Sequence, residues 1–226
     1  MKPAGVFFMI ASLLCSGLAK AQTAQQWRDS LSVLNRQIDI SPYSSDLHLR
    51  KAAVNLELGQ WEYAIEEYDF VLKKEPDNIA ALFYRAYANV NMRRFEQARD
   101  DYEAVLKRAA YNMEARLGLA YVYTKLNRPG EAMDEINQTV EMFPDSATAY
   151  AARAVMEREQ KAYAAALYDW EQAARLCPEN IDYKISQVDI LLLMNNKREA
   201  RSFLDKMVRE GTPRGLLREW YAKCSK

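Results

Sequence analysis

The chain has 226 residues, half of them hydrophobic, and its 31 basic residues balance 31 acidic ones. This balance excludes the global basic field with which many proteins attract nucleic acid. One histidine and three cysteines also leave few side chains for a metal centre or a histidine-based catalytic site.

The first 21 residues have the pattern of a secretory signal peptide. Lys2 gives a basic start, residues 6–14 form an apolar run, and Ala19-Lys20-Ala21 supplies the small residues of a cleavage site. The apolar run is too short to span a membrane as a helix, which takes roughly 20 residues. We therefore predict cleavage after Ala21 and export to the periplasm. The mature chain then has 29 basic and 31 acidic residues and inserts no segment into a membrane.

The three cysteines are expected to carry neither a lipid nor a disulfide. Lipid attachment at Cys15 is the alternative to cleavage, but bacterial lipidation takes a small residue before the cysteine, and Leu14 is not small. Cys177 and Cys224 remain after cleavage, and an oxidising compartment permits a disulfide between two cysteines. Because a whole sequence repeat lies between these two, we expect two free thiols.

Most of the remaining chain repeats with a period of 34 residues. A fixed period of this length is typical of helix–turn–helix units that bury their apolar faces only against one another. One row of alanines keeps the period without insertion or deletion, at Ala64, Ala98, Ala132, Ala166 and Ala200. A second row contains Ala52, Ala86, Ala120, Ala154 and Val188. A third contains Pro42, Pro76, Pro144 and Pro178, with Ala110 and Thr212 where proline is missing.

Each unit predicts two amphipathic helices, at positions 1–14 and 17–30, from apolar residues spaced three and four apart. Residues such as Gly59-Gln60 form the turn between the two helices, and segments such as Pro76-Asp77-Asn78 separate successive units. Residues 24–42 match only the second half of a unit, and residues 213–226 match a first helix that caps the array. The full units span residues 45–78, 79–112, 113–146, 147–180 and 181–212, and residues 22–226 are predicted to form one solenoid domain.

In every unit an alanine is followed four residues later by a large side chain. The aromatic pairs are Ala64 and Tyr68, Ala98 and Tyr102, and Ala166 and Trp170, with Ile136 and Leu204 in the other two units. This spacing, followed by proline, resembles the tetratricopeptide repeat, and the match covers residues 45–212. The family favours tryptophan at position 4, where this chain has none. The resemblance implies an all-α, right-handed solenoid, and the signal-peptide pattern predicts that it is exported. We expect a protein that is not an enzyme and holds no cofactor.

A row of charges also follows the period. Position 7 is basic and position 23 acidic in three units, so these side chains are expected to pair between the two helices of one unit and to have a structural role. The third unit has Leu119 at position 7, which leaves Glu135 without a predicted partner. The predicted pairs are Lys51 with Glu67, Arg85 with Asp101, and Arg153 with Asp169.

No set of residues with catalytic or metal-binding spacing is found. His48 is the only histidine and occupies position 4, a packing position. The seven glycines form no phosphate-binding loop. Adjacent acidic residues on a helix point in different directions and do not make a paired-carboxylate site.

The resemblance implies a binding surface instead, because in this family first-helix positions 2, 5, 6, 9, 12 and 13 line an inner groove. In this chain that groove would be aromatic, and Gly118 is expected to leave open space in it. The same rings could instead pack on neighbouring first helices. The candidate groove residues are Arg50, Phe83, Tyr84, Tyr87, Asn91, Leu117, Tyr121 and Lys125.

Two functions remain open at this point. The first is a non-catalytic scaffold of the cell envelope that binds a protein or peptide in the groove. The alternative is a structural subunit packed permanently into an envelope or secretion assembly. Binding of chaperone tails is not supported, because the lysine, asparagine and arginine clamp of that branch of the family is replaced by Leu49, Ala53, Tyr84, Glu114 and Gly118.

Overall fold

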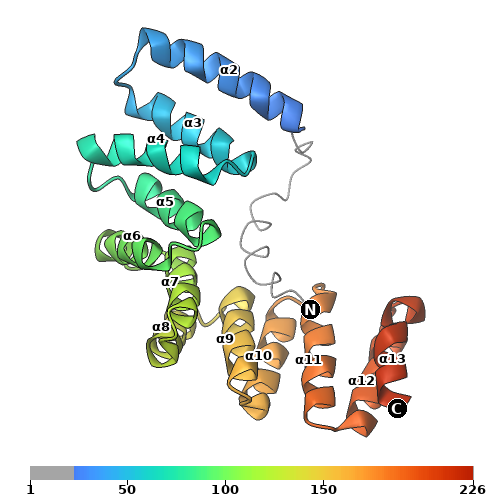
Figure 1. Cartoon of the computed structure of the whole chain (residues 1–226). Coiled ribbons are helices and arrows are strands. Elements are labelled where there is room, and N and C mark those ends of the chain that lie inside the picture. The colour runs from blue at the N-terminus through green and yellow to red at the C-terminus, as the bar shows by residue number, and fades with distance from the viewer. Residues whose placement is uncertain (1–22, 226) are drawn as a thin grey trace. The chain divides into compact units, whose positions relative to one another are not determined.

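The computed structural model describes residues 23–225, so the predicted signal peptide and Cys15 lie outside the described residues. Over this range the chain forms twelve α-helices and one 3-10 turn, with no strand (Figure 1). These helices divide into two compact bodies, an N-terminal body ending at Glu135 and a C-terminal body beginning at Ile136. Each body has its own cluster of buried apolar side chains.

The N-terminal body begins with a single helix and continues with helix pairs. Helices adjacent in sequence pack against each other. From α3 onward, the observed ends agree with the predicted helices at positions 1–14 and 17–30 to within one residue. The helices are α2 (Ala24–Ile40), α3 (Ser45–Glu57), α4 (Trp61–Lys74), α5 (Ile79–Asn91), α6 (Phe95–Arg108), α7 (Met113–Lys125) and α8 (Pro129–Met142), which continues into the C-terminal body.

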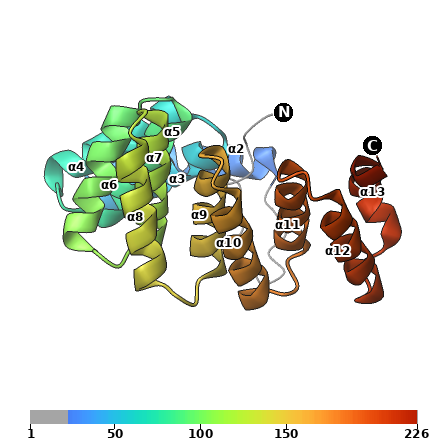
Figure 2. The same cartoon turned by 90° about the horizontal axis from the view of Figure 1, so that it is seen from below.

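The C-terminal body has the same pairing and ends in a short cap (Figure 2). Its helices are α9 (Ala147–Glu159), α10 (Tyr163–Leu176), α11 (Ile181–Leu193), α12 (Lys197–Arg209), the 3-10 turn η1 (Arg214–Leu217) and α13 (Arg218–Ser225). The single capping helix predicted for residues 213–226 is therefore a 3-10 turn followed by a shorter helix. Trp220 and Tyr221 pack against the last apolar cluster, as a cap requires. Cys177 and Cys224 are free thiols.

The ends of the helices follow from local side-chain chemistry. Every first helix is preceded by an asparagine or serine whose side chain accepts a hydrogen bond from a backbone N–H group of the first turn, as Asn78 does from Ala81. In every full unit, the second residue after the first helix has a left-handed backbone. Glycine and asparagine adopt this conformation readily, whereas Arg93 and Lys161 adopt it with φ near 60°. The turn geometry is thus kept in all five units although its residue type varies.

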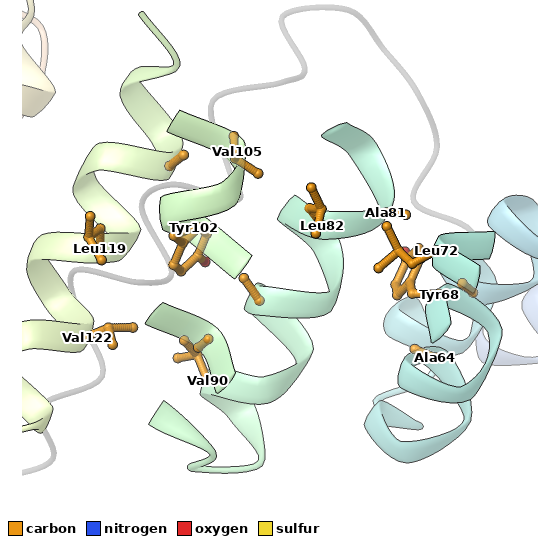
Figure 3. Close-up of a cluster of buried hydrophobic side chains, with 14 of the residues drawn as sticks. Ala64, Tyr68, Leu72, Ala81, Leu82, Val90, Tyr102, Val105, Leu119 and Val122 are labelled. Carbon is orange, nitrogen blue, oxygen red and sulfur yellow. The ribbon is translucent and has the colours of Figure 1, made fainter. Parts of the chain in front are cut away.

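Small side chains line the seam between the two helices of each unit. The alanines of both rows are at most 1% exposed, and their size permits the spacing of about 8–10 Å usual for packed helices. The large residues four positions later fill the space beside the seam, and Figure 3 shows Tyr68 and Tyr102 among the buried side chains. The predicted row of small residues therefore sets the distance between helices.

Gly118 belongs to this packing and does not open the groove, contrary to the sequence-based expectation. A Cβ atom added at Gly118 would lie 2.6 Å from Cζ and 2.9 Å from the hydroxyl oxygen of Tyr102. The Tyr102 side chain is 1% exposed and sits in the core. Glycine is needed here because the ring of the preceding helix occupies the place of a side chain.

Charge pairs connect the helices of the N-terminal body. The Arg85 guanidinium donates to both carboxylate oxygens of Asp101, at 2.6 and 2.9 Å, which confirms the predicted pair. It also donates to Asp69 of the preceding unit at 2.6 Å, a contact that the pattern did not predict. Hydrogen bonding to Asp101 raises the pKa of Arg85 above its ordinary value. Arg85 is therefore held in the structure and is not free to bind a ligand.

The other two predicted pairs are also present. In the C-terminal body Arg153 donates to Asp169 at 2.6 and 2.9 Å and to the Asn137 side chain at 3.2 Å. In the N-terminal body Lys51 Nζ lies 2.6 Å from a carboxylate oxygen of Glu67. Arg153 repeats the bridge that Arg85 makes, with two bonds to its own unit and one to the helix before it.

The expectation that Glu135 lacks a partner is wrong. Arg116, at position 4 of the same unit, pairs with Glu135 in place of the missing position-7 base. His48, also at position 4, pairs in the same way with Glu67. Glutamate has one methylene more than aspartate, so a glutamate at position 23 reaches position 4. His48 is thus buried and bonded, as a packing residue is.

The Gly118→Ala substitution should lower the free energy of unfolding by about 1–3 kcal/mol, because Tyr102 cannot yield without disturbing the core. This loss should outweigh the better helix propensity of alanine, about 1 kcal/mol. Gly130→Ala is the matched control, since an added Cβ there meets no atom within 4 Å. Urea unfolding followed by circular dichroism measures both variants, and equal stability of the two would contradict the packing role of Gly118.

Candidate functional site

The exposed part of the predicted groove is an aromatic face on α5 and α7, two first helices that contact each other in the N-terminal body. We define this aromatic face as Tyr84, Tyr87 and Tyr121. Tyr84 is 42% exposed, and the other two are half-buried. Tyr84 and Tyr87 are three residues apart on one helix and so lie on the same side of it. The face therefore presents ring surface while its rings remain attached to rigid helices.

Other rings support the aromatic face from behind. The Tyr84 ring lies 5.2 Å from the Phe83 ring, edge to face, and 6.3 Å from the ring of buried Tyr68. Tyr87 meets Trp61 edge to face at 5.9 Å. Aromatic pairs in these arrangements stabilise beyond the area they bury. The exposed rings are thus held in position before any partner arrives.

Polar groups flank the aromatic face. Asn91 is exposed, and its side-chain amide donates to the Tyr87 carbonyl oxygen at 2.9 Å. Lys125 places its ammonium 4.8 Å from the centre of the Tyr121 ring, which is a cation–π contact. Tyr121 is therefore covered in part by a flexible side chain that a partner could displace.

Three of the predicted groove residues neither belong to the aromatic face nor flank it. Leu117 is 4% exposed and contributes packing, so it offers no contact surface. Phe83 is partly buried against the core cluster and acts as the support of Tyr84. Arg50 is exposed on α3, with Asp46 3.8 Å away, and belongs to a separate groove.

That separate groove lies between α2 and α3 and was not predicted from the sequence. Its volume is about 540 Å³, and we call it the α2–α3 groove. Apolar side chains dominate its walls, with Arg50 and Glu57 as the charged members. The lining residues are Trp27, Ser30, Val33, Leu34, Arg50, Ala53, Val54 and Glu57.

Comparisons with known proteins agree with this architecture. A model of the tetratricopeptide repeat matches residues 89–156. The chain thus contains tetratricopeptide repeats in the part that the model matches and has the fold of proteins built from them. A tetratricopeptide repeat protein from Parabacteroides merdae has a structure similar to this chain, with a TM-score of 0.71 at 18% identity over 84% of this chain and 75% of the other. No curated protein matches the sequence.

Two further solved structures share the fold. PilF from Pseudomonas aeruginosa gives a TM-score of 0.66 at 17% identity over 83% of this chain and 86% of the other. YrrB, described as a TPR protein with an unusual peptide-binding site, gives a TM-score of 0.58 at 18% identity over 78% of this chain and 91% of the other. At these identities the likeness concerns the tetratricopeptide-repeat fold, a fold of protein-interaction scaffolds.

Glu157 has a strongly perturbed carboxyl group. It lies on α9 near Arg153 and Asp169, and burial together with the Asp169 charge raises its pKa to about 7. Its Oε2 atom is buried and forms no hydrogen bond with any described residue. The first two units have Asn55 and Asn89 at the same position 11, both buried and neutral. Glu157 is therefore an acid in a place that favours a neutral side chain.

These titratable groups do not assemble into a reactive centre. Within residues 23–225, no three histidine, cysteine or acidic side chains are grouped so that they could hold a metal ion. Glu157 faces an arginine and a carboxylate that are already paired with each other. Its raised pKa therefore bears on stability. Among the described helices, none combines the length and apolar character that crossing a membrane requires.

The raised pKa predicts how stability depends on pH. Because folded Glu157 keeps a proton that the unfolded chain releases near pH 4.5, its contribution to stability is full below that pH and is lost as the pH rises toward 7. Glu157→Gln should therefore leave stability nearly unchanged at pH 5 and raise it at pH 8 by about 1 kcal/mol, since the side chain is only half-buried.

Urea unfolding of both proteins at the two pH values tests this expectation. Glu159→Gln, an exposed substitution on the same helix, is the control and should show no such difference between the two pH values. A stabilisation by Glu157→Gln that is the same at pH 5 and pH 8 would show that the residue does not titrate in this range.

Proposed function

We propose that this protein is a non-catalytic scaffold of the cell envelope that binds a protein or peptide segment on the aromatic face. The observation that carries the proposal is that two adjacent first helices bear one exposed tyrosine, Tyr84, and two half-buried ones, Tyr87 and Tyr121. The first helix α9 of the C-terminal body has small or aliphatic side chains at positions 5, 6 and 9, namely Ala151, Ala152 and Val155. The aromatic surface is thus a local feature of the N-terminal body.

The physical properties of the aromatic face suit an apolar ligand. Tyr84 and Tyr87 already pack against other rings, so ordering these two side chains on binding costs little entropy. Tyrosine gives a large contact area together with a polar hydroxyl, and for this reason it is common at interaction hot spots. Nearby charges are mixed, with Lys125 at one end of α7 and Glu114 at the other. We therefore expect an extended or helical segment with apolar side chains, and not a strongly ionic one.

The fold supports the same proposal at a coarser level. Tetratricopeptide-repeat arrays are interaction scaffolds, and YrrB, which shares the fold, is a protein with a peptide-binding site. Function resides in sites that differ between proteins of one fold. The aromatic face, and not the similarity, is therefore the basis of the assignment.

Location in the envelope rests on the signal-peptide pattern of residues 1–21. If the pattern is used as proposed, the mature protein begins at Gln22, because Ala19-Lys20-Ala21 fits the cleavage site. N-terminal sequencing of the protein recovered from the periplasm of an expressing bacterium should give Gln22. A lipid-modified Cys15 or an intact Met1 would refute cleavage at this site.

The combined substitution Tyr84→Ala and Tyr121→Ala should abolish partner recovery in a pull-down from the source cell envelope. Truncating one aromatic side chain at a hot spot costs about 2 kcal/mol or more of binding free energy, so the effect of two truncations is readily detected. Helical content and the unfolding transition should change little, because both rings are at least partly exposed.

The matched control removes two other exposed tyrosines, Tyr63 and Tyr168, which lie on second helices. This control should retain the partner. The opposite result, in which the control fails to recover the partner and the aromatic-face variant keeps it, would favour the structural-subunit function over the scaffold.

A further inference from the structure

Helix α2 is a second helix that no first helix of its own unit covers within the described residues. Trp27, Ser30 and Leu34 lie one period before Trp61, Ala64 and Tyr68. Ala64 is fully buried by its first helix, as are its equivalents in the later units. Ser30 holds the same position on α2 and is only half-buried. The face of α2 with the small residue is thus open, and α2 packs mainly against α3 (Figure 1).

The α2–α3 groove occupies the place of the missing first helix. Trp27, Ser30 and Leu34 form one wall. In the first complete unit, the equivalents Ala64 and Tyr68 of the last two are buried in one apolar cluster with the first-helix residue Ala52. Ala53 and Val54 of the next first helix form the opposite wall. A first helix in a complete unit likewise packs between its own second helix and the following first helix. The groove therefore has the lining that a repeat offers to a helix.

Helix α2 starts too early for the usual turn of a complete unit to precede it. In the full units the second helix starts at position 17, after a residue with a left-handed backbone. Helix α2 instead has 17 residues and starts at Ala24, three residues before that position. Thr23 closes its start with a capping box. Residues 24–26, which would have to form the turn, are therefore already part of α2.

Among the described residues, α2 is a second helix without its first helix, whereas α13 resembles a first helix without its second helix. It packs on α12 as a first helix packs on the preceding unit. The Tyr221 hydroxyl, at position 7, donates to Asp205 at 2.7 Å over a spacing of 16 residues. Arg85 donates to Asp69 over the same spacing. Ala222 then falls in the row of buried alanines, one period after Val188, yet it is exposed. Its side of α13 has no second helix against it within residues 23–225 (Figure 2).

The C-terminal end of the chain is basic. Residues 197–226 contain nine basic and four acidic residues, which gives a net charge of +5. Residues 22–196 contain 20 basic and 27 acidic residues, a net charge of −7. Residues 22–58, which contain both walls of the groove, have four basic and four acidic residues, so no net charge there opposes the approach of a basic helix.

We infer that α13 of one copy packs into the α2–α3 groove of a second copy and completes a tetratricopeptide repeat across the joint. Ala222 then faces Ser30, the pair of small residues that a seam between two helices requires. The joint uses different surfaces on the two copies, so it is head-to-tail and can be repeated by further copies. The aromatic face takes no part in it, so this inference is independent of the proposed function.

Single substitutions at either end provide the test, in the chain that begins at Gln22 and keeps every described helix. Wild type should show an average mass in analytical ultracentrifugation that rises with concentration beyond that of a dimer. Ser30→Arg and Ala222→Arg should each be monomeric, because an arginine in the seam blocks one of the two surfaces. A mixture of the two variants, with a label on one, should form a heterodimer and stop there, because one intact surface remains on each copy.

Exposed residues of the same types supply the controls, Ser202→Arg on α12 and Ala165→Arg on α10, which should associate as wild type does. Circular dichroism checks that all four variants are folded. A wild type that stays monomeric at several hundred micromolar overturns the inference. So does a mixture without heterodimer, because a symmetric interface would give that result.

Discussion

Close approach of helices at positions 8 and 20 is the constraint on which the other features of this protein depend. Alanine at both positions lets the backbones approach, and the larger side chain at position 24 fills the adjacent space. Once the spacing is fixed, charged groups on facing helices come within hydrogen-bond distance, and the remaining first-helix side chains point away from the seam. The ion pairs and the aromatic face both follow from this spacing. Gly118 shows how strict it is, since there even one methyl group meets the Tyr102 ring.

The fold could be predicted almost completely from the sequence because the signal is repeated. Five copies of one pattern place the helix ends to within one residue, since the same cap and turn recur in each unit. The prediction failed where the length of a side chain decides which residue it pairs with. Glu135 has no base at position 7, yet its longer side chain reaches Arg116 at position 4. The signs of the charges along the sequence do not show how far a side chain extends. The pairing of Glu135 with Arg116 is therefore seen only in the geometry of the facing helices.

The candidate site could be predicted less well, because exposure depends on neighbours that are distant in sequence. Their positions in the repeat predicted both Tyr84 and Leu117 as groove residues. In the structure Tyr84 is 42% exposed, whereas Leu117 is only 4% exposed. Phe83 proved to be a support of Tyr84 rather than a contact residue. The α2–α3 groove could not be predicted for the opposite reason. Its lining residues follow the repeat, and what makes them a groove is the lack of a covering helix among the described residues.

A repeat array buries each helix by means of its neighbours, so the same rule that makes its interior stable leaves its two ends unsatisfied. Many arrays meet this difficulty with polar terminal helices. Here α13 carries a basic surface, but it keeps a small residue at position 8, and α2 keeps one at position 20. Small residues bring no benefit to a face that meets only water. Their retention at both ends, in the register of the internal seams, is the physical reason to regard the ends as two halves of one interface. Joining the ends would leave the aromatic face free, so assembly and ligand binding can coexist in one molecule.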